Sequence, residues 1–261
     1  QPNAMGGREV GGLANMLAVH KDYTNDQHRE QVGTFWGTNN ISSKPGLTAT
    51  EMMDAMIDGK LKALWVICTN PVVSWPNARK ADEALKKCNF LVVQDISSKS
   101  DTLEYADLVL PAAGFMEKEG TMTNSERRIS YLPKIVEAPG EALPDTEIIQ
   151  RFAQKMGYKK ASNFKNTEEV YKEHAALTKG TNLDVSGLDY SILKSRRSVQ
   201  WPYKTGEKGD GTARLFEDGI FYTNDKKAHI LPTPSHNQSE PTSQTYPFVL
   251  TTGRIRDQWH T

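Results

Sequence analysis

Short apolar runs alternate with amphipathic stretches along residues 46–111 of the chain. Three of these runs have the length of a strand, and each ends at a proline or a polar residue: Ala63–Cys68, Leu91–Val93 and Asp107–Leu110. The first run is apolar at every position, as in a strand that is covered on both faces. Helical patterns fill the gaps, from Asn77 to Lys87 and again from Ser100. This alternation predicts an α/β fold with an open, mostly parallel, Rossmann-like sheet and flanking helices.

Helix signals also occur on either side of this region. Thr48 and Glu51 have the spacing of a capping box, and the methionines that follow supply an apolar face. Asp145 is predicted to cap a second helix, and Asn166 begins a third whose His174 we expect in the core or at its rim. The residues expected to face inward on the second helix are Ile148, Ile149, Phe152, Ala153 and Met156.

Residues 1–45 are rich in glycine or in polar side chains. Four glycines and a proline in the first 12 residues argue against a regular helix and favour a loop whose backbone can approach a ligand closely. Arg8 is the only cation of that segment and suits an oxyanion, with a solvated surface arginine as the alternative. From residue 21 onward we expect a long polar loop anchored by Phe35 and Trp36. Residues 1–45 are therefore interpreted as a glycine-rich loop and connector.

The C-terminal part of the chain has a different pattern. Residues 209–230 alternate around an Asp-Gly turn and predict a small hairpin. Residues 232–247 have the composition of a linker, and Phe248–Thr251 predicts the beginning of another strand. We expect an α/β domain over residues 46–236, and a linker with the first strand of a β-barrel domain over residues 237–261. Since the chain starts without methionine and stops just after that strand, we expect a piece of a longer protein.

Composition and charge narrow the class of protein. The 261 residues include 37% hydrophobic and 25% charged residues, as in a globular protein with a core. The 32 basic and 32 acidic residues cancel, which argues against nucleic acid or an anionic membrane as a partner. No apolar run has the length of a membrane span and no signal peptide opens the chain, so we expect a cytoplasmic protein. Cys68 and Cys88 adjoin apolar runs and predict buried structural thiols, and the scattered histidines predict no metal site.

Polar side chains gather where the predicted strands end. Asn70 follows the first strand, Gln94 and Asp95 end the second, and a charged loop follows the third. The carboxyl ends of parallel strands meet at one edge, where open α/β sheets bind ligands. Asp95 could accept from the ring N–H and amino group of a guanine base, or cap the following helix. Lys118 could contact a phosphate or pterin, or be a solvated surface lysine, and residues 124–128 predict a polar loop over the edge.

Six motifs occur in order along the chain: T-N-P-V-V-S-W-P-N, V-V-Q-D-I, A-D-L-V-L-P-A-A-G, E-K-E-G-T-M-T-N-S-E-R-R, A-P-G-E-A-L-P-D and T-T-G-R-I-R-D-Q-W-H-T. Together they resemble the molybdopterin oxidoreductase superfamily, whose members hold molybdenum on two pterin guanine dinucleotides. The opening Q-P-N-A-M-G-G-R-E-V-G-G and the closing motif resemble the assimilatory nitrate reductases in particular. The resemblance spans nearly the whole chain.

This resemblance implies a role for each matching position. The residues that match contacts of a molybdopterin guanine dinucleotide are Asn70, Gln94, Asp95, Lys118 and Asp145. The residues that match the segment entering the cap domain, which touches the pterin and phosphates, are Thr252, Gly253, Arg254, His260 and Thr261. Gln1, Arg8 and Glu9 match a loop near the substrate funnel, where Arg8 would attract nitrate.

The resemblance also implies the chemistry of a longer parent protein. Such a protein reduces nitrate to nitrite by oxygen-atom transfer at bis-molybdopterin guanine dinucleotide with molybdenum, with electrons from a donor protein or an NADH-linked flavoprotein. Its iron–sulfur cluster and metal ligand belong to a more N-terminal region, so no catalytic residue is expected in this chain. The alternatives are a formate dehydrogenase, a non-catalytic relative such as the large iron–sulfur subunit of complex I, and a different nucleotide-binding module. Asp95 and Lys118 argue against the non-catalytic relative, which need not keep nucleotide contacts.

Overall fold

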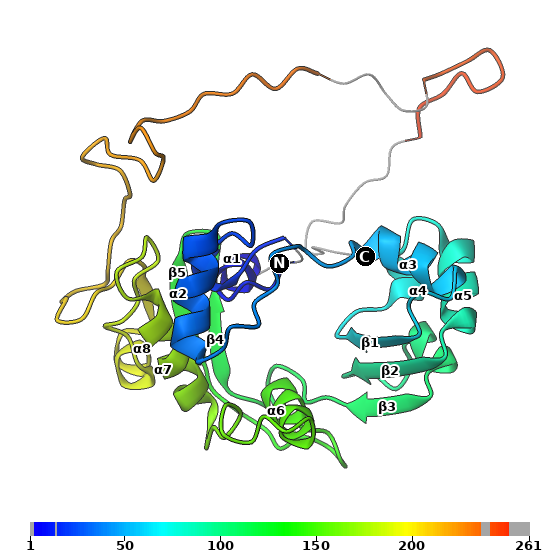
Figure 1. The fold of residues 1–261 in the computed structure, drawn as a ribbon, viewed down its shortest axis with the longest axis horizontal. Helices are drawn as coiled ribbons and strands as arrows, with labels where there is room; N and C mark the ends of the chain where they lie inside the picture. The colour runs from blue at the N-terminus through cyan, green and yellow to red at the C-terminus, as the bar shows by residue number, and fades with distance from the viewer. Residues whose placement is uncertain (1–2, 14, 236–240, 251–261) are drawn as a thin grey trace. The chain divides into compact units, whose positions relative to one another are not determined.

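The computed structural model describes residues 3–13, 15–235 and 241–250. The chain divides into two units, one formed by Pro2–Ala213 and the other by Arg214–Thr261 with Gln1. The first unit contains the helices and strands labelled in Figure 1. Each unit is described below by itself.

A parallel sheet of three strands confirms the predicted α/β fold. The strands are β1 (Ala63–Ile67), β2 (Phe90–Asp95) and β3 (Leu108–Pro111), and they lie in that order. Val66 pairs with Val93 and Val93 with Val109, so the strands end close to one another at their carboxyl ends. The connections contain three short or medium helices: α4 (Pro71–Ser74), α5 (Ala78–Lys87) and the 3₁₀ helix η2 (Asp101–Tyr105).

Helices cover one face of this sheet. The predicted capping box begins α3 (Ala49–Ile57), and α3 packs on α5, which in turn buries Leu85 against Val66, Leu91 and Val93. The three helices α3, α4 and α5 lie together on one side of the sheet in Figure 1. On the opposite face of β1, Trp65 is half-buried and packs edge-on against Phe152, with 5.0 Å between the ring centroids, whereas Ile67 is 39% exposed. The strand is therefore covered on both faces only in part.

A second, antiparallel sheet, which was not predicted, flanks the polar loop expected at residues 124–128. It consists of β4 (Gly120–Thr123), β5 (Arg128–Leu132) and β6 (Ser198–Gln200), in that order. Residues 124–127 form only the tight turn between β4 and β5, closed by the Asn124 side chain, which accepts from the backbone N–H groups of Glu126 and Arg128. The third strand comes from far along the chain, and no local pattern in residues 124–128 could indicate that pairing.

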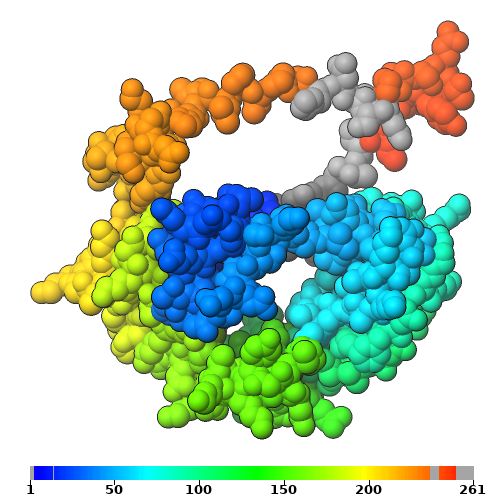
Figure 2. Space-filling view, in the orientation of Figure 1, coloured from blue at the N-terminus to red at the C-terminus, as the bar shows by residue number. Residues whose placement is uncertain are grey.

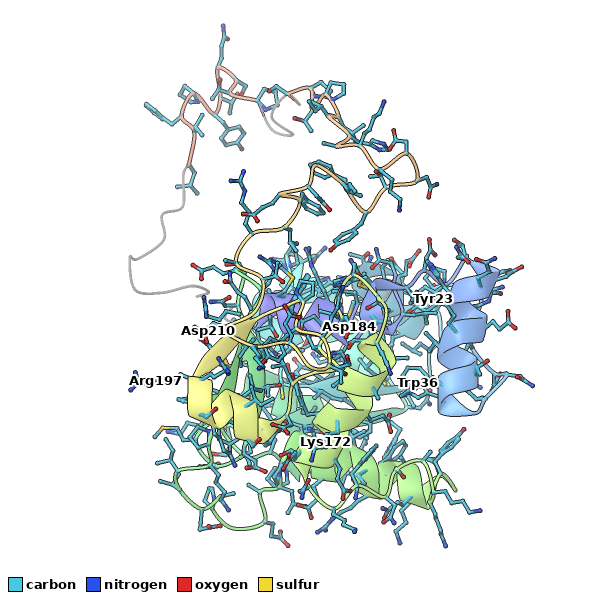
Figure 3. The ribbon with its side chains drawn as sticks, turned by 90° about the vertical axis from the view of Figure 1, so that its left-hand side faces the viewer. Tyr23, Trp36, Lys172, Asp184, Arg197 and Asp210 are labelled. Atoms are coloured by element: carbon cyan, nitrogen blue, oxygen red, sulfur yellow. The ribbon has the colours of Figure 1, made fainter. Side chains whose placement is uncertain are left out.

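The N-terminal region is helical, contrary to the loop that its composition predicted. It contains α1 (Ala4–Glu9), the 3₁₀ helix η1 (Ala18–His20) and α2 (Asp26–Trp36). Asn25 caps α2 by accepting from two backbone N–H groups. This cap was missed because the surrounding residues are polar and were assigned to a loop. Trp36 lies at the end of this helix (Figure 3) and is 44% exposed, so it does not anchor a loop.

Three further helices follow the antiparallel hairpin: α6 (Asp145–Lys155), α7 (Thr167–Thr178) and α8 (Tyr190–Arg196). Asn166 caps α7 as predicted. Pro144, not Asp145, occupies the cap position of α6, and the Asp145 side chain accepts from Gln94. Of the α6 residues expected to face inward only Ile148 is buried, whereas Phe152 and Met156 are 50% and 62% exposed, in keeping with the surface position of α6 (green) in Figure 2.

The second unit has no strand in its described residues. The hairpin predicted over residues 209–230 is wrong: an alternating pattern is present, but residues 214–235 form turns without a ladder partner. Residues 248–250 are not in a strand, and the predicted barrel strand continues outside the described residues, so no barrel is confirmed. None of the helices in the described residues has the length and apolar character needed to cross a membrane.

Candidate functional site

Three side chains from separate elements converge on the carboxylate of Asp145, at the first position of α6. The Gln94 side chain, at the end of β2, donates from Nε2 to Asp145 Oδ1 at 2.6 Å. Lys118, from the loop before β4, forms an ion pair with Asp145 Oδ2. Cys68, directly after β1, donates from Sγ to Asp145 Oδ1 at 3.5 Å. The structure thus brings together three of the predicted cofactor residues at the carboxyl edge of the parallel sheet.

The electrostatics of this cluster favour a charged carboxylate. Burial alone would raise the pKa of Asp145, but hydrogen bonds from Lys118 and Gln94 and the charge of Lys118 hold that pKa below its ordinary value. The N-terminus of α6 adds a favourable dipole. Burial, followed by the charge of Asp145, raises the pKa of the Cys68 thiol to about 11. Cys68 is therefore a neutral hydrogen-bond donor at the edge of the site.

Cys68 also corrects a prediction, because the residue as a whole is exposed, although its thiol is partly shielded from water beside Asp145. It follows β1 with a positive φ of 55°, which turns the chain out of the sheet. Cys88 is only half-buried and donates weakly to backbone carbonyls. Neither thiol is a fully buried core residue.

One buried acceptor in the cluster is left without a partner. Gln94 is fully buried, and its Oε1 atom has no hydrogen-bond partner among the described residues. A buried amide oxygen without a partner costs about 1–3 kcal/mol, so such atoms in folded proteins commonly mark a missing water, ion or ligand. The cluster therefore has spare capacity to accept a hydrogen bond.

Asp95 lies beside the cluster, in a cleft of about 560 Å³ next to β2 and β3. Its Oδ1 accepts from the backbone N–H of Ser97 at 3.0 Å, and Oδ2 has no partner among the described residues. Because η2 begins only at Asp101, Asp95 is not the cap of the following helix. Its carboxylate is half-buried and can accept donors from a ligand in the cleft.

Apolar side chains of the cleft were not anticipated from the sequence. Phe115 is 73% exposed and Met116 is 40% exposed, and both line the cleft with Asp95. An exposed aromatic ring next to a carboxylate suits a planar, hydrogen-bonding ring system. Only the motif A-A-G-F-M, an apolar pair following a glycine loop, could have indicated them.

Asn70 lies at the same edge but is already engaged. Its Oδ1 accepts from Thr102 Oγ1 at 2.7 Å and its Nδ2 donates to Asp101 Oδ2 at 3.0 Å. These bonds join the start of α4 to η2 and thereby position the loop after β1. Asn70 does not contact the Asp145 cluster in these bonds.

Of the predicted funnel residues, the structure describes Arg8 and Glu9. Arg8 is exposed on α1, whereas Glu9 is 4% exposed and accepts from Thr123 Oγ1 at 2.8 Å and Trp201 Nε1 at 2.5 Å. Burial raises the pKa of Glu9. The predicted residues Gln1, Thr252, Gly253, Arg254, His260 and Thr261 lie outside the described residues.

Comparisons with known proteins identify the family of this chain. The sequence profile of the molybdopterin oxidoreductase family matches residues 4–155, which include all five predicted cofactor residues of the described chain. The chain belongs to the molybdopterin oxidoreductase family. This membership implies a molybdopterin cofactor and an oxidoreductase class, and it confirms the resemblance seen in the motifs.

Curated relatives match this chain over its whole length. A nitrate reductase from Synechocystis is 40% identical over 266 residues, and the assimilatory nitrate reductase catalytic subunit of Bacillus subtilis is 34% identical over 263 residues. The α subunit of an F420-dependent formate dehydrogenase from Methanocaldococcus jannaschii is 36% identical over 262 residues. In each comparison 100% of the chain is covered, and the chain spans 37% of the relative's length.

No group of three or more metal-ligating side chains occurs in the part of the chain that the structure describes. The cluster around Asp145 is instead an arrangement of hydrogen-bond donors and acceptors with one cation. Such an arrangement can bind and orient a polar ligand, and its one thiol, on Cys68, is held in the protonated form.

Proposed function

We propose that this chain supplies the guanine nucleotide half of a cofactor site in a molybdenum nitrate reductase. The residues assigned to this role are Asn70, Gln94, Asp95, Lys118 and Asp145. The observation that carries the proposal is the convergence of Gln94 and Lys118 on Asp145, beside the cleft that holds Asp95. The proposed cofactor is bis-molybdopterin guanine dinucleotide.

The residues at this edge fit a guanine nucleotide. The free Asp95 oxygen can accept from the ring N–H or amino group of the base, and Phe115 offers a ring face in the same cleft. Lys118 provides the positive charge for a phosphate, and Gln94 Oε1 can accept from a hydroxyl or amino group. A phosphate that binds Lys118 competes with Asp145 for the ammonium group, so the ion pair would rearrange on binding.

The proposed parent reaction is reduction of nitrate to nitrite. When bound, the molybdenum cofactor supplies two-electron redox chemistry with oxygen-atom transfer, and the protein supplies binding, orientation and electrostatics. The proposal includes an iron–sulfur cluster elsewhere in the parent, an electron-donor protein or NADH-linked flavoprotein as partner, and a cytoplasmic location. The chain alone is expected to be inactive with nitrate, because it contributes no metal ligand in this assignment.

A formate dehydrogenase is the second candidate, since one such relative is 36% identical, within the range of the nitrate reductases. The full-length parent distinguishes the two. Nitrate-dependent oxidation of a reduced viologen dye supports the nitrate reductase, whereas formate-dependent reduction of the dye supports the dehydrogenase. Absence of both activities in cofactor-loaded protein would favour the non-catalytic relative.

Titration calorimetry of GDP tests the proposed site. Charged hydrogen bonds contribute about 1.5–3 kcal/mol each, so GDP is expected to bind at least about tenfold more tightly than ADP. Asp95→Asn should remove the preference for GDP over ADP, because the asparagine N–H₂ group and the guanine ring N–H are both donors and cannot bond to each other. Asp54→Asn, on the exposed surface of α3, is the matched control. Equal binding of GDP by the wild-type and Asp95→Asn proteins would remove Asp95 from the guanine role.

A further inference from the structure

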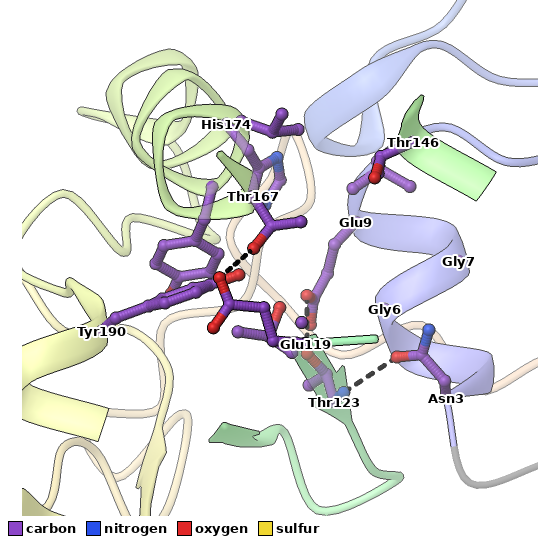
Figure 4. A pocket seen from close by; sticks show the side chains of 15 residues that line it. Asn3, Gly6, Gly7, Glu9, Glu119, Thr123, Thr146, Thr167, His174 and Tyr190 are labelled. Atoms are coloured by element: carbon purple, nitrogen blue, oxygen red, sulfur yellow. Dashed lines mark hydrogen bonds between the residues drawn. The ribbon is translucent and has the colours of Figure 1, made fainter. Parts of the chain in front are cut away.

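A second cavity is lined by none of the five residues assigned to the guanine nucleotide. It measures about 280 Å³ and lies between α1, β4 and α7 (Figure 4), with Tyr190 of α8 and Thr146 of α6 at its wall. Figure 4 shows Thr167 bonded to Glu119 and Asn3 bonded to the backbone of Thr123. We call it the α1–α7 cavity.

Glycines keep this cavity open. A Cβ atom added at Gly7 or at Gly120 would meet no atom within 4 Å, so neither glycine is needed there for close backbone packing. Gly7 lies within α1, where alanine would be the better helix former by about 1 kcal/mol. The space next to these glycines is available to a ligand.

The wall of the cavity carries negative charge and no fixed cation. Of the described residues that line it, Glu9 and Glu119 are carboxylates and none is lysine or arginine. Hydrogen bonds from Tyr131 and Thr167, together with the charge of Lys194 outside the cavity, hold the pKa of Glu119 below its ordinary value. Burial lowers the pKa of His174 to about 4, so its ring is neutral and offers no positive charge. The described lining therefore offers no positive charge to an anion such as nitrate.

Tyrosine side chains give the cavity its remaining chemistry. Tyr171 is 7% exposed, and its hydroxyl group has no hydrogen-bond partner among the described residues. The ring of Tyr190, 5.7 Å from that of Tyr171, already has the Lys194 ammonium 5.8 Å from its centroid. Aromatic faces and carboxylates together attract organic cations. The Tyr171 hydroxyl can accept an N–H from such a ligand.

We propose that the α1–α7 cavity binds a small organic ammonium ion, with Glu119 as its counter-ion and the Tyr171 hydroxyl as an acceptor. The volume exceeds that of a cavity of about 150 Å³ that holds benzene, so an ammonium on a ring-sized apolar body fits. This site shares no residue with the proposed guanine nucleotide site. Failure of either proposal therefore leaves the other intact.

Benzylammonium tests the proposal, with benzyl alcohol and benzoate as neutral and anionic ligands of the same shape. Each is titrated into the ¹⁵N-labelled 261-residue chain while amide shifts are followed. Saturable shifts at Gly7 and Gly120 with benzylammonium, and weaker binding of the other two, are expected. Equal binding of benzyl alcohol would show an unselective apolar cavity and overturn the proposal, as would the absence of shifts at these glycines.

Two variants assign the residues. Glu119→Gln should weaken benzylammonium binding by about tenfold or more, since a charged hydrogen bond is lost, while the exposed control Glu173→Gln should not. Tyr171→Phe should also weaken binding. Because no described residue bonds to that hydroxyl, this variant should fold as stably as the wild type and remains informative if Glu119→Gln does not fold. Unchanged affinity in Tyr171→Phe would overturn the assigned contact.

Discussion

Glu9 is the residue whose replacement should change the stability of this chain most clearly. Its carboxylate is 4% exposed and joins α1 to β4 through Thr123 and to the segment after β6 through Trp201. Glu9→Ala leaves two buried donors without an acceptor, each at a cost of about 1–3 kcal/mol. Burial of the carboxylate itself, which raises the pKa of Glu9, offsets part of that loss. We expect a net destabilisation of about 3 kcal/mol.

Urea denaturation measures this loss. The transition is followed by far-ultraviolet circular dichroism, and the midpoint should fall at an unchanged slope. Glu9→Gln keeps the volume and one acceptor oxygen, so it should lose about half as much free energy as Glu9→Ala. Arg8→Ala is the control: it removes an exposed neighbour on the same helix and should change stability by no more than about 0.5 kcal/mol.

A double-mutant cycle separates the hydrogen bond from other effects. Glu9→Ala combined with Trp201→Phe should show a coupling energy of about 1–2 kcal/mol, because the indole no longer needs an acceptor. A loss below about 1 kcal/mol in Glu9→Ala, or a coupling energy of zero, would refute the assignment of Glu9 as the link between α1 and the antiparallel sheet.

Three further predictions concern pH, a helix cap and the thiol. Burial lowers the pKa of His174 from 6.5 to about 4, so the unfolded chain binds more protons than the folded chain between these pH values, and about 3 kcal/mol of stability is lost as the pH falls from 6.5 to 4. Thermal melts of His174→Gln should lack this loss. Glu9, whose raised pKa makes stability change with pH in the opposite direction, is present in both proteins and does not affect the comparison. Thr48→Ala removes the capping box of α3 and should cost about 1 kcal/mol by urea denaturation, whereas the same change at exposed Thr50 should cost less. Cys68, whose pKa burial and the charge of Asp145 raise to about 11, should react with iodoacetamide at pH 8 about tenfold more slowly than an ordinary thiol, as measured by mass spectrometry. Asp145→Asn should raise the rate, and an unchanged rate in this variant would contradict the contact between Cys68 and Asp145.

The parallel half of the fold could be predicted because its signals are local. Thr48, Asn77 and Asn166 each cap a helix at the position that the sequence indicated, and the apolar runs form strands in chain order. The antiparallel sheet could not be predicted, because β6 pairs with β5 from about 70 positions away in the chain. The alternating pattern at residues 209–230 predicted a hairpin that the structure does not contain, since alternation without a partner strand does not form a ladder.

The N-terminal helices were missed for a different reason. Gly6 and Gly7 lower the helix propensity of α1, but the hydrogen bonds that Glu9 accepts from Thr123 and Trp201 stabilise the helix in the folded chain. In the same way, Asp145 has the residue type of a helix cap, yet its side chain binds Lys118 and Gln94 instead. Residue types along the chain indicated the edge of the sheet at which the candidate site lies. Only the folded arrangement shows which of those residues meet.

The central claim is that a guanine nucleotide binds at the edge formed by Asp95 and the Asp145 cluster. The most direct test is a titration of GDP into the ¹⁵N-labelled chain, observed through the backbone amide of Ser97 and the side-chain amide of Gln94. Both signals should shift saturably with GDP and much less with ADP, because Ser97 donates to Asp95 and Gln94 Oε1 is free to accept. Shifts that are absent at both positions, or that ADP reproduces in full, would contradict the account.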